Sequence, residues 1–169
     1  MRVEHLAAVD AIEQISFPSP RSTSLYRNEV EKNRLGHYFV IEPIAERRAA
    51  LPAVLAYGGY WLTGNEAHIV VIATEPRWRR NQLGRWLLLE MTAVARLQGA
   101  LQITLEVRQQ NHAAQQLYLG LGFVEVGIQR RYYRDTGEDA HLLTLFGLDN
   151  GAVWRPLAAV LKGYRTILT

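Results

Sequence analysis

Hydrophobic positions near the start of the chain predict two helices. Across residues 6–17 the apolar side chains recur about every third position, a spacing typical of an amphipathic helix, and a proline-containing turn follows. A second helix is expected from a cap at Ser24 to about Asn33, with Leu25 and Val30 facing inward. We therefore expect a helical pair ahead of the first strand.

Three segments rich in Val, Ile, Tyr and Trp follow, and each is long enough for a strand. They span residues 37–42, 54–63 and 68–74. A charged loop at 44–52 separates the first two, whereas Gly64-Asn65 is a strong signal for a tight turn before the third. Three consecutive antiparallel strands are the expected structure.

In the middle of the chain the apolar residues first follow a helical period and then alternate with polar residues. Apolar residues across 83–96 form one helical stripe, and Gly99 supplies its end. Apolar and polar residues alternate in 101–108, which places Glu106 on the face opposite the leucines. Because strands joined by a crossover helix are usually parallel, we expect a parallel pair within a mixed sheet.

The remaining pattern completes an α/β (α+β) fold. Asn111 can cap a helix that runs to about Leu119. Strands are expected at 124–131 and 141–148, with a turn at 135–137 between them. We therefore expect a single domain with a twisted, mixed sheet of about six to seven strands, flanked by about four helices.

Composition is that of an ordinary globular protein. The 169-residue chain is 49% apolar and 21% charged, and no apolar run approaches the ~20 residues of a membrane span. Its first residues lack the apolar core and cleavage site of a secretory signal. We therefore expect a cytoplasmic protein with no membrane segment.

Cysteine and histidine usage limits the available chemistry. The sequence has no cysteine, which excludes a disulfide framework, a thiolate metal site and a covalent cysteine intermediate. Its histidines are scattered without paired ligand spacing, so no metal site is expected. We interpret all of them as structural or surface residues: His5, His37, His68, His112 and His141.

Positive charge gathers in one short segment. The net charge is only +3, yet Arg77, Arg79, Arg80 and Arg85 lie together where a strand leads through a loop into a helix. Unpaired backbone N–H groups, the helix dipole and guanidinium groups all favour an anion at such a helix start. Arginines that merely face water are the alternative. No nucleic-acid binding is expected, because the cluster is single and compact.

This loop resembles the acetyl-CoA pyrophosphate loop of the GNAT acetyltransferase superfamily, whose pattern is Arg/Gln-x-x-Gly-x-Gly/Ala. Here the pattern is Arg79-x-x-Gln82-x-Gly84. Gln82 therefore occupies the position where the family usually has its first glycine. A glycine lets the backbone approach the phosphate and adopt unusual dihedral angles, so this difference bears on the affinity for the cofactor.

The downstream segment resembles ribosomal-protein alanine N-acetyltransferases of the RimI type within that superfamily. The matching runs are Leu105-Glu106-Val107-Arg108, Asn111, Leu117-Tyr118, Leu121-Gly122-Phe123, Arg130-Arg131-Tyr132-Tyr133 and Asp139-Ala140. The similarity covers residues 72–148 well and the first helices more loosely. It implies an N-acetyltransferase domain at 1–148.

The resemblance also implies roles for individual residues. The backbone of Ile72, Ala73 and Thr74 would hold the pantetheine arm of acetyl-CoA, with Asn111 as a further contact. Glu106 would be the general base and Tyr118 the general acid. The residues implied for the pyrophosphate are Arg79, Arg80, Asn81, Gln82, Leu83, Gly84 and Arg85.

Elementary chemistry is consistent with these residue types. An N-terminal amine has a pKa near 8 and attacks a thioester only when neutral, so a carboxylate such as Glu106 must accept a proton. A phenol such as Tyr118 can protonate the departing thiolate. Direct attack in a ternary complex then suffices, without an acyl-enzyme.

Each residue also has a plainer interpretation. Taken alone, Asn111 is a helix cap, Tyr118 is a core residue and Glu106 is a strand carboxylate facing solvent. Tyr132, Tyr133 and Phe17 are candidates for substrate binding, though they are equally suited to packing.

The expected acceptor is the α-amine of a protein N-terminus, and the resemblance suggests a ribosomal protein. A small-molecule amine is the enzymatic alternative, because the fold does not fix the substrate. A CoA-binding module without catalysis is the other alternative.

The tail at 149–169 lies beyond the resemblance and is expected to form a short amphipathic helix after Pro156. It is a candidate surface for a homodimer. Its apolar residues are Trp154, Leu157, Val160, Leu161 and Tyr164.

Overall fold

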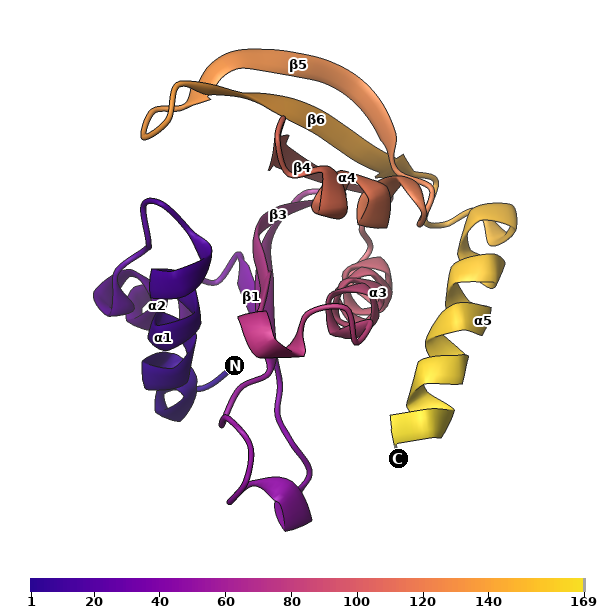
Figure 1. Ribbon diagram of the computed structural model, residues 1–169. Coiled ribbons are helices and arrows are strands. Elements are labelled where there is room, and N and C mark those ends of the chain that lie inside the picture. Colours follow the sequence, from indigo (N-terminus) through magenta and orange to yellow (C-terminus); the bar gives the residue numbers. More distant parts are fainter. Residues whose placement is uncertain (169) are drawn as a thin grey trace. The chain divides into compact units, whose positions relative to one another are not determined.

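Helices and strands follow one another along the chain in the order that the hydrophobic pattern predicts (Figure 1). The computed structural model describes residues 1–168. Its helices are α1 (Leu6–Ser16), α2 (Thr23–Glu31), α3 (Leu83–Leu97), α4 (His112–Leu119) and α5 (Gly151–Leu168). Its strands are β1 (Gly36–Ile41), β2 (Ala56–Thr63), β3 (Glu66–Thr74), β4 (Gln102–Arg108), β5 (Val124–Tyr133) and β6 (Glu138–Phe146). Short 3-10 turns lie at Val3–His5, Ala45–Arg47 and Pro76–Trp78.

The strands form one mixed sheet in the order β1-β2-β3-β4-β6-β5, which confirms the expected fold class with six strands. The β3 and β4 strands pair in parallel, as the crossover through α3 predicts. The β1–β2, β4–β6 and β5–β6 pairs are antiparallel. The chain divides into two compact units, Met1–Trp61 with Val70–Met91 and Leu62–Ile69 with Thr92–Thr169.

In the first unit α1 and α2 lie side by side (Figure 1). The cap of α2 is Ser22, whose hydroxyl accepts a hydrogen bond from the Leu25 amide at 3.3 Å, and not Ser24 as predicted. Leu25 is 42% exposed, and Tyr26 is buried in its place. The inward face of α2 is therefore set by Tyr26, whose ring packs edge-on against Tyr57 at 5.8 Å.

A buried carboxylate ties this unit together. Glu13 of α1 is fully buried and accepts hydrogen bonds from the hydroxyls of Tyr26 and Tyr57, the latter at 2.6 Å. The Arg21 amide donates to the same carboxylate at 3.0 Å, while the Arg21 guanidinium donates to the Val70 carbonyl at 2.8 Å. One side chain thus joins α1, the α1–α2 connection, α2 and β2.

In the second unit β4 shows the predicted alternation, with Ile103, Leu105 and Val107 buried on one face. The β5 and β6 strands form a long hairpin (Figure 1), and Gly137 adopts a φ of +70° in the turn between them. Both strands extend further toward this turn than the pattern predicts. The hairpin therefore carries Tyr132 and Tyr133 close to its tip.

The C-terminal helix begins earlier than predicted. Asn150 caps it by accepting from the Ala152 amide at 2.9 Å, so α5 starts at Gly151 and Pro156 lies inside it. Leu157 and Leu161 of α5 are buried. Within residues 1–168, no helix is long and apolar enough to span a bilayer.

Candidate functional site

The connection from β3 to α3, in the first unit, has a backbone shaped by two left-handed residues. Glu75 begins it by accepting hydrogen bonds from both the amide and the guanidinium of Arg77, at 2.9 and 2.8 Å. Arg80 and Gln82 then adopt φ values of +66° and +62°. The Gln82 carbonyl accepts from the Trp86 amide at 3.0 Å, so the first helical turn of α3 follows at once.

Gln82 has the backbone conformation that glycine would adopt at this position. A left-handed conformation costs a non-glycine residue ~1–2 kcal/mol. The backbone here is thus left-handed with a glutamine in place of the family's usual glycine. Compared with glycine, glutamine adds a Cβ and a side chain at this position. They lie on the backbone segment that is expected to face a phosphate.

Arg85 carries the clearest sign that this loop receives an anion. Its Nε atom is buried, and in the described part of the chain it meets no hydrogen-bond acceptor. Buried N–H groups are nearly always paired, so this donor is one that a bound anion or an ordered water could satisfy. Together with the arginine-rich loop and the start of a long helix, this donor fits the diphosphate of a coenzyme.

Other residues of the loop have structural contacts. The Asn81 side-chain amide donates to the Trp78 and Arg79 carbonyls, each at 3.1 Å. Arg79 donates to the Thr74 carbonyl at 3.4 Å and to the Ser16 hydroxyl at 3.2 Å. Their first role is thus to shape the loop.

The end of β3 supplies the segment expected to bind pantetheine. Ala73 is buried in the core of the first unit, while Ile72 and Thr74 on the other face are half-buried. Backbone groups at the end of this strand are the candidates for holding an extended arm. Phe17, directly after α1, is half-buried and packs against the same core.

In the second unit Glu106 of β4 makes a contact that the sequence did not suggest. Its Oε2 lies 3.1 Å from Nε2 of His68 on β3, and its side chain is 20% exposed. Parallel pairing sets His68 beside Thr104, one pleat before Glu106 on the same face. His68, expected to be a structural or surface residue, is thus a partner of Glu106. Alternation could predict its face, but only the strand register reveals its partner.

Electrostatics of this pair favour a protonated histidine. The hydrogen bond to Glu106 raises the pKa of His68 above its ordinary value of about 6.5, and the charge of Glu66 adds to this, while burial opposes it. The imidazole therefore titrates closer to neutral pH than a free histidine would.

Tyr118 and Asn111 have the structural roles that their plainer interpretations predict. Tyr118 is 4% exposed and packs against Phe123 with ring centroids 5.6 Å apart. Burial raises the pKa of its phenol well above the usual range, which keeps the proton on the hydroxyl. Asn111 caps α4, its Oδ1 accepting from the Ala114 amide at 3.2 Å. Neither role conflicts with a contact to a bound cosubstrate.

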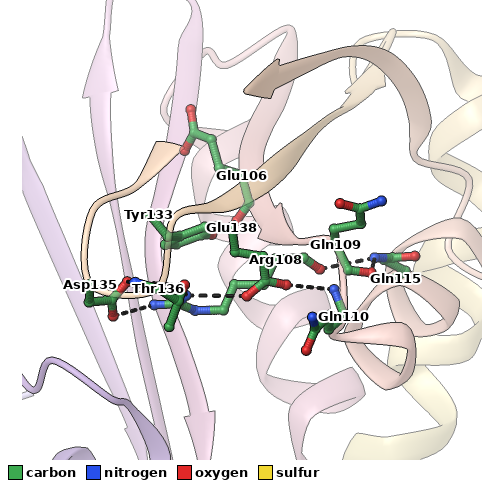
Figure 2. A network of polar contacts seen from close by, with 9 residues as sticks. All are labelled: Glu106, Arg108, Gln109, Gln110, Gln115, Tyr133, Asp135, Thr136 and Glu138. Atoms are coloured by element: carbon green, nitrogen blue, oxygen red, sulfur yellow. Dashed lines mark hydrogen bonds and ion pairs between the residues drawn. The ribbon is translucent and has the colours of Figure 1, made fainter. Parts of the chain in front are cut away.

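Arg108 joins β4 to the turn of the β5–β6 hairpin (Figure 2). Its guanidinium lies 2.7 Å from an Asp135 oxygen and 3.3 Å from a Glu138 oxygen, and it donates to the Thr136 hydroxyl at 2.8 Å. The Tyr133 ring lies over the guanidinium, 3.8 Å from its carbon. Five donors in a planar fork suit such a site, which lysine could not satisfy.

Further contacts extend this network to the start of α4. The Gln110 amide donates to Glu138 at 2.6 Å, and the Gln115 side chain donates to the Gln109 carbonyl at 2.8 Å (Figure 2). The Tyr133 hydroxyl donates to the Glu106 carbonyl at 3.4 Å, and burial raises the pKa of Tyr133 to about 12. The end of β5, which bears Tyr132 and Tyr133, is thus fixed to β4, the strand that carries Glu106.

Tyr132 and Tyr133 differ in exposure. Tyr132 is 39% exposed and packs edge-on against Tyr133 at a centroid distance of 5.0 Å. Tyr133 is the packed member and Tyr132 the accessible one. In residues 1–168 there is no group of three or more side chains that could hold a metal ion.

Comparison with known proteins gives the context for this arrangement. Residues 6–123 match the Acetyltransferase (GNAT) family, which is most of the chain. The chain belongs to the GNAT acetyltransferase family. It is therefore an acetyl-CoA-dependent N-acetyltransferase, and the unpaired Arg85 donor lies in the first turn of α3, directly after the loop expected to hold the coenzyme.

Curated relatives of this GNAT acetyltransferase act on ribosomal protein bS18 according to their names. A Bacillus subtilis (strain 168) protein provisionally named as a bS18-alanine N-acetyltransferase is 35% identical over 143 residues, covering 85% of this chain and 90% of that protein. The Escherichia coli (strain K12) bS18-alanine N-acetyltransferase is 41% identical over 83 residues, covering 48% of this chain and 56% of that protein.

Solved structures agree on the fold. The crystal structure of the ribosomal-protein-S18-alanine N-acetyltransferase from Escherichia coli has a TM-score of 0.74 at 29% identity, covering 86% of this chain and 90% of that one. Ard1 from Thermoplasma volcanium has a TM-score of 0.75 at 24% identity, covering 88% and 95%. The second similarity concerns the fold alone.

Proposed function

We propose that this GNAT acetyltransferase modifies the α-amine of a protein N-terminus, with a ribosomal protein as the leading candidate. The observation that carries the proposal is the Arg108 network, which fixes the turn bearing Tyr132 and Tyr133 to the strand bearing Glu106. The two tyrosines at the end of β5 are held against the strand that carries Glu106. Such an arrangement suits an extended polypeptide, because its backbone groups can contact the tyrosine hydroxyls and rings. The names of the curated relatives support the same acceptor.

The loop between β3 and α3 would hold the coenzyme. Arg80, Arg85 and the N–H groups around Gly84 would bind its diphosphate, and the end of β3 its pantetheine arm. Asn111 caps α4 through its side-chain oxygen Oδ1, so its side-chain nitrogen Nδ2 is the atom that would donate to the coenzyme. When bound, acetyl-CoA supplies the thioester carbonyl that the amine nitrogen attacks.

The catalytic residues would handle protons. Glu106 accepts a proton from the incoming ammonium, because only a neutral amine is nucleophilic. Tyr118 is protonated at neutral pH, as any phenol is, and it would donate that proton to the sulfur as the carbon–sulfur bond breaks. Burial raises the pKa of Tyr118, which makes the phenol a weaker acid than a free tyrosine. Backbone N–H groups at the end of β3 would stabilise the oxyanion. No covalent intermediate on the protein is needed.

An acceptor screen tests this proposal. The protein is incubated with acetyl-CoA and, separately, a bS18 N-terminal peptide, peptides with other first residues, and small amines such as polyamines, and products are identified by mass spectrometry. We expect acetylation at the α-amine, and no product when that amine is blocked but a lysine is free. Modification of small amines alone would contradict the proposal. Failure to bind acetyl-CoA at millimolar concentration in calorimetry would contradict any enzymatic role for this chain.

We also propose a cytoplasmic location, since newly made ribosomal proteins are the expected acceptors. Assembly into a homodimer through α5 is part of the same proposal. Leu157 and Leu161 are buried, so Val160, 38% exposed, is the large apolar side chain of residues 151–166 that is open to a second copy. Light scattering of the full chain and of Val160→Glu tests this: a monomeric mass for the full chain contradicts it.

A further inference from the structure

A continuous chain of polar contacts runs along one face of β3 and β4, ending at Glu106. The Gln102 side-chain amide donates to one Glu66 oxygen at 2.5 Å, and the Thr104 hydroxyl donates to the other Glu66 oxygen at 3.1 Å. Nδ1 of His68 lies 3.0 Å from that hydroxyl oxygen, and Nε2 lies 3.1 Å from Glu106. Every member belongs to the second unit, and the alternation of both strands puts them on a common face.

These contacts indicate which nitrogen of His68 carries the proton when the imidazole is neutral. A threonine hydroxyl has one proton, and that of Thr104 goes to Glu66. The Thr104 oxygen must therefore accept from His68, which requires a proton on Nδ1. Nε2 is then left as the titrating nitrogen, and it is the one that faces Glu106.

The Nε2–Glu106 contact is attractive only when a proton lies between the two atoms. Without it, a nitrogen lone pair would face a carboxylate oxygen at 3.1 Å. The pair is therefore built to take up one proton. Imidazole is the better final acceptor, because its ordinary pKa of about 6.5 is closer to that of an N-terminal amine than the value of about 4.3 for a glutamate.

We propose that the proton leaving the attacking amine passes through Glu106 and comes to rest on Nε2 of His68, with Thr104 and Glu66 as positioning residues that fix the imidazole tautomer. This inference rests on the proposed function. The ammonium gives up two protons overall: one goes to the Glu106–His68 pair, and the other replaces the proton that Tyr118 gives to the departing sulfur. The carbon–sulfur bond breaks as the nitrogen gains the acetyl carbon. The side chain of His68 is 33% exposed, so its proton then leaves to water.

The pH dependence follows from the groups facing His68. These are Glu106 from β4 and Glu66 from β3, and both raise its pKa against the opposing effect of burial. The pair works as a base only while Nε2 is unprotonated. Turnover at saturating substrates should therefore fall as the pH drops through the raised pKa of His68, above about 6.5.

Nuclear magnetic resonance of labelled histidine tests the tautomer without any turnover. We expect the neutral ring of His68 to carry its proton on Nδ1, with a pKa above 6.5. Thr104→Val should move that proton to Nε2, and Glu106→Gln should lower the pKa. A neutral ring protonated on Nε2 in the unmodified protein would overturn the assignment of Thr104 and Glu66.

Kinetics test the proton acceptor. His68→Gln keeps hydrogen-bonding groups but cannot titrate, so we expect turnover to fall about 10²-fold and its acid limb to move to lower pH. His141→Gln is the matched control, because His141 also pairs with a glutamate, Glu125, at 2.7 Å in the same unit. If His68→Gln stays within twofold with an unchanged acid limb, the inference is wrong. A wild-type protein inactive on every amine would instead contradict the proposed function.

Discussion

At the scale of single residues, the loop before α3 depends on an unusual backbone choice. Gln82 occupies a left-handed conformation that glycine adopts freely and glutamine does not. Its side chain therefore adds bulk to the surface on which we propose that the coenzyme phosphates bind.

Replacing Gln82 with glycine should strengthen coenzyme binding. Gln82→Gly relieves the unfavourable φ of +62° and removes the Cβ, so we expect the dissociation constant for acetyl-CoA to fall several-fold in calorimetry. Gln82→Val is the opposing variant, since a β-branched residue is disfavoured at positive φ. Weaker binding by the glycine variant would show that the glutamine side chain itself contacts the coenzyme.

Tyr118 allows packing and chemistry to be separated. Tyr118→Phe preserves the ring that packs against Phe123, so the melting temperature should change little. Turnover should nevertheless fall about 10²-fold, because the sulfur then has no positioned acid. Melting curves and steady-state rates on the same preparation check this. Turnover within twofold of the original would assign Tyr118 to the core alone.

At the scale of elements, Arg108 makes several of the contacts that hold the β5–β6 turn. Arg108→Lys keeps the positive charge but cannot reproduce contacts to Asp135, Thr136 and Glu138 together. We expect the KM for peptide to rise about tenfold with a smaller change in kcat, and acetyl-CoA affinity to stay constant. Arg130→Lys, on the exposed part of β5, is the control. An equal loss of coenzyme affinity would contradict a role confined to the turn.

Sequence patterns predict elements well where one face of a strand or helix is buried. Alternation in β4 placed Glu106 correctly, and the Asn111 cap and the Gly137 turn are local signals that survive in the structure. The cap at Ser24 was wrong because Ser22 offers the same chemistry two residues earlier.

The partners of the site residues were beyond the reach of the sequence. His68 meets Glu106 only because of the parallel register, which no local pattern encodes. Arg108 likewise meets Asp135 and Glu138 through strand pairings between residues distant along the chain. A lone histidine or arginine in a sequence does not reveal such contacts.

At the scale of the whole molecule, α5 is part of the fold even though it lies beyond the family match. Leu161 is 3% exposed, and Arg96 of α3 both donates to the Leu148 carbonyl at 2.7 Å and lies over the Trp154 ring. Leu161→Ala should therefore lower the free energy of unfolding by about 2–4 kcal/mol, as measured by denaturant titration. Val160→Ala, at an exposed position, is the control. A change below about 0.5 kcal/mol for Leu161→Ala would show that α5 adds nothing to stability.

The buried Glu13 cluster constrains how this protein can change over generations. Glu13 is the shared acceptor for the Tyr26 and Tyr57 hydroxyls and for the Arg21 backbone amide, so replacing Glu13 alone would leave two buried hydroxyls without this acceptor. A change at position 13 is therefore coupled to changes at positions 26 and 57, and an apolar replacement of this cluster needs all three together.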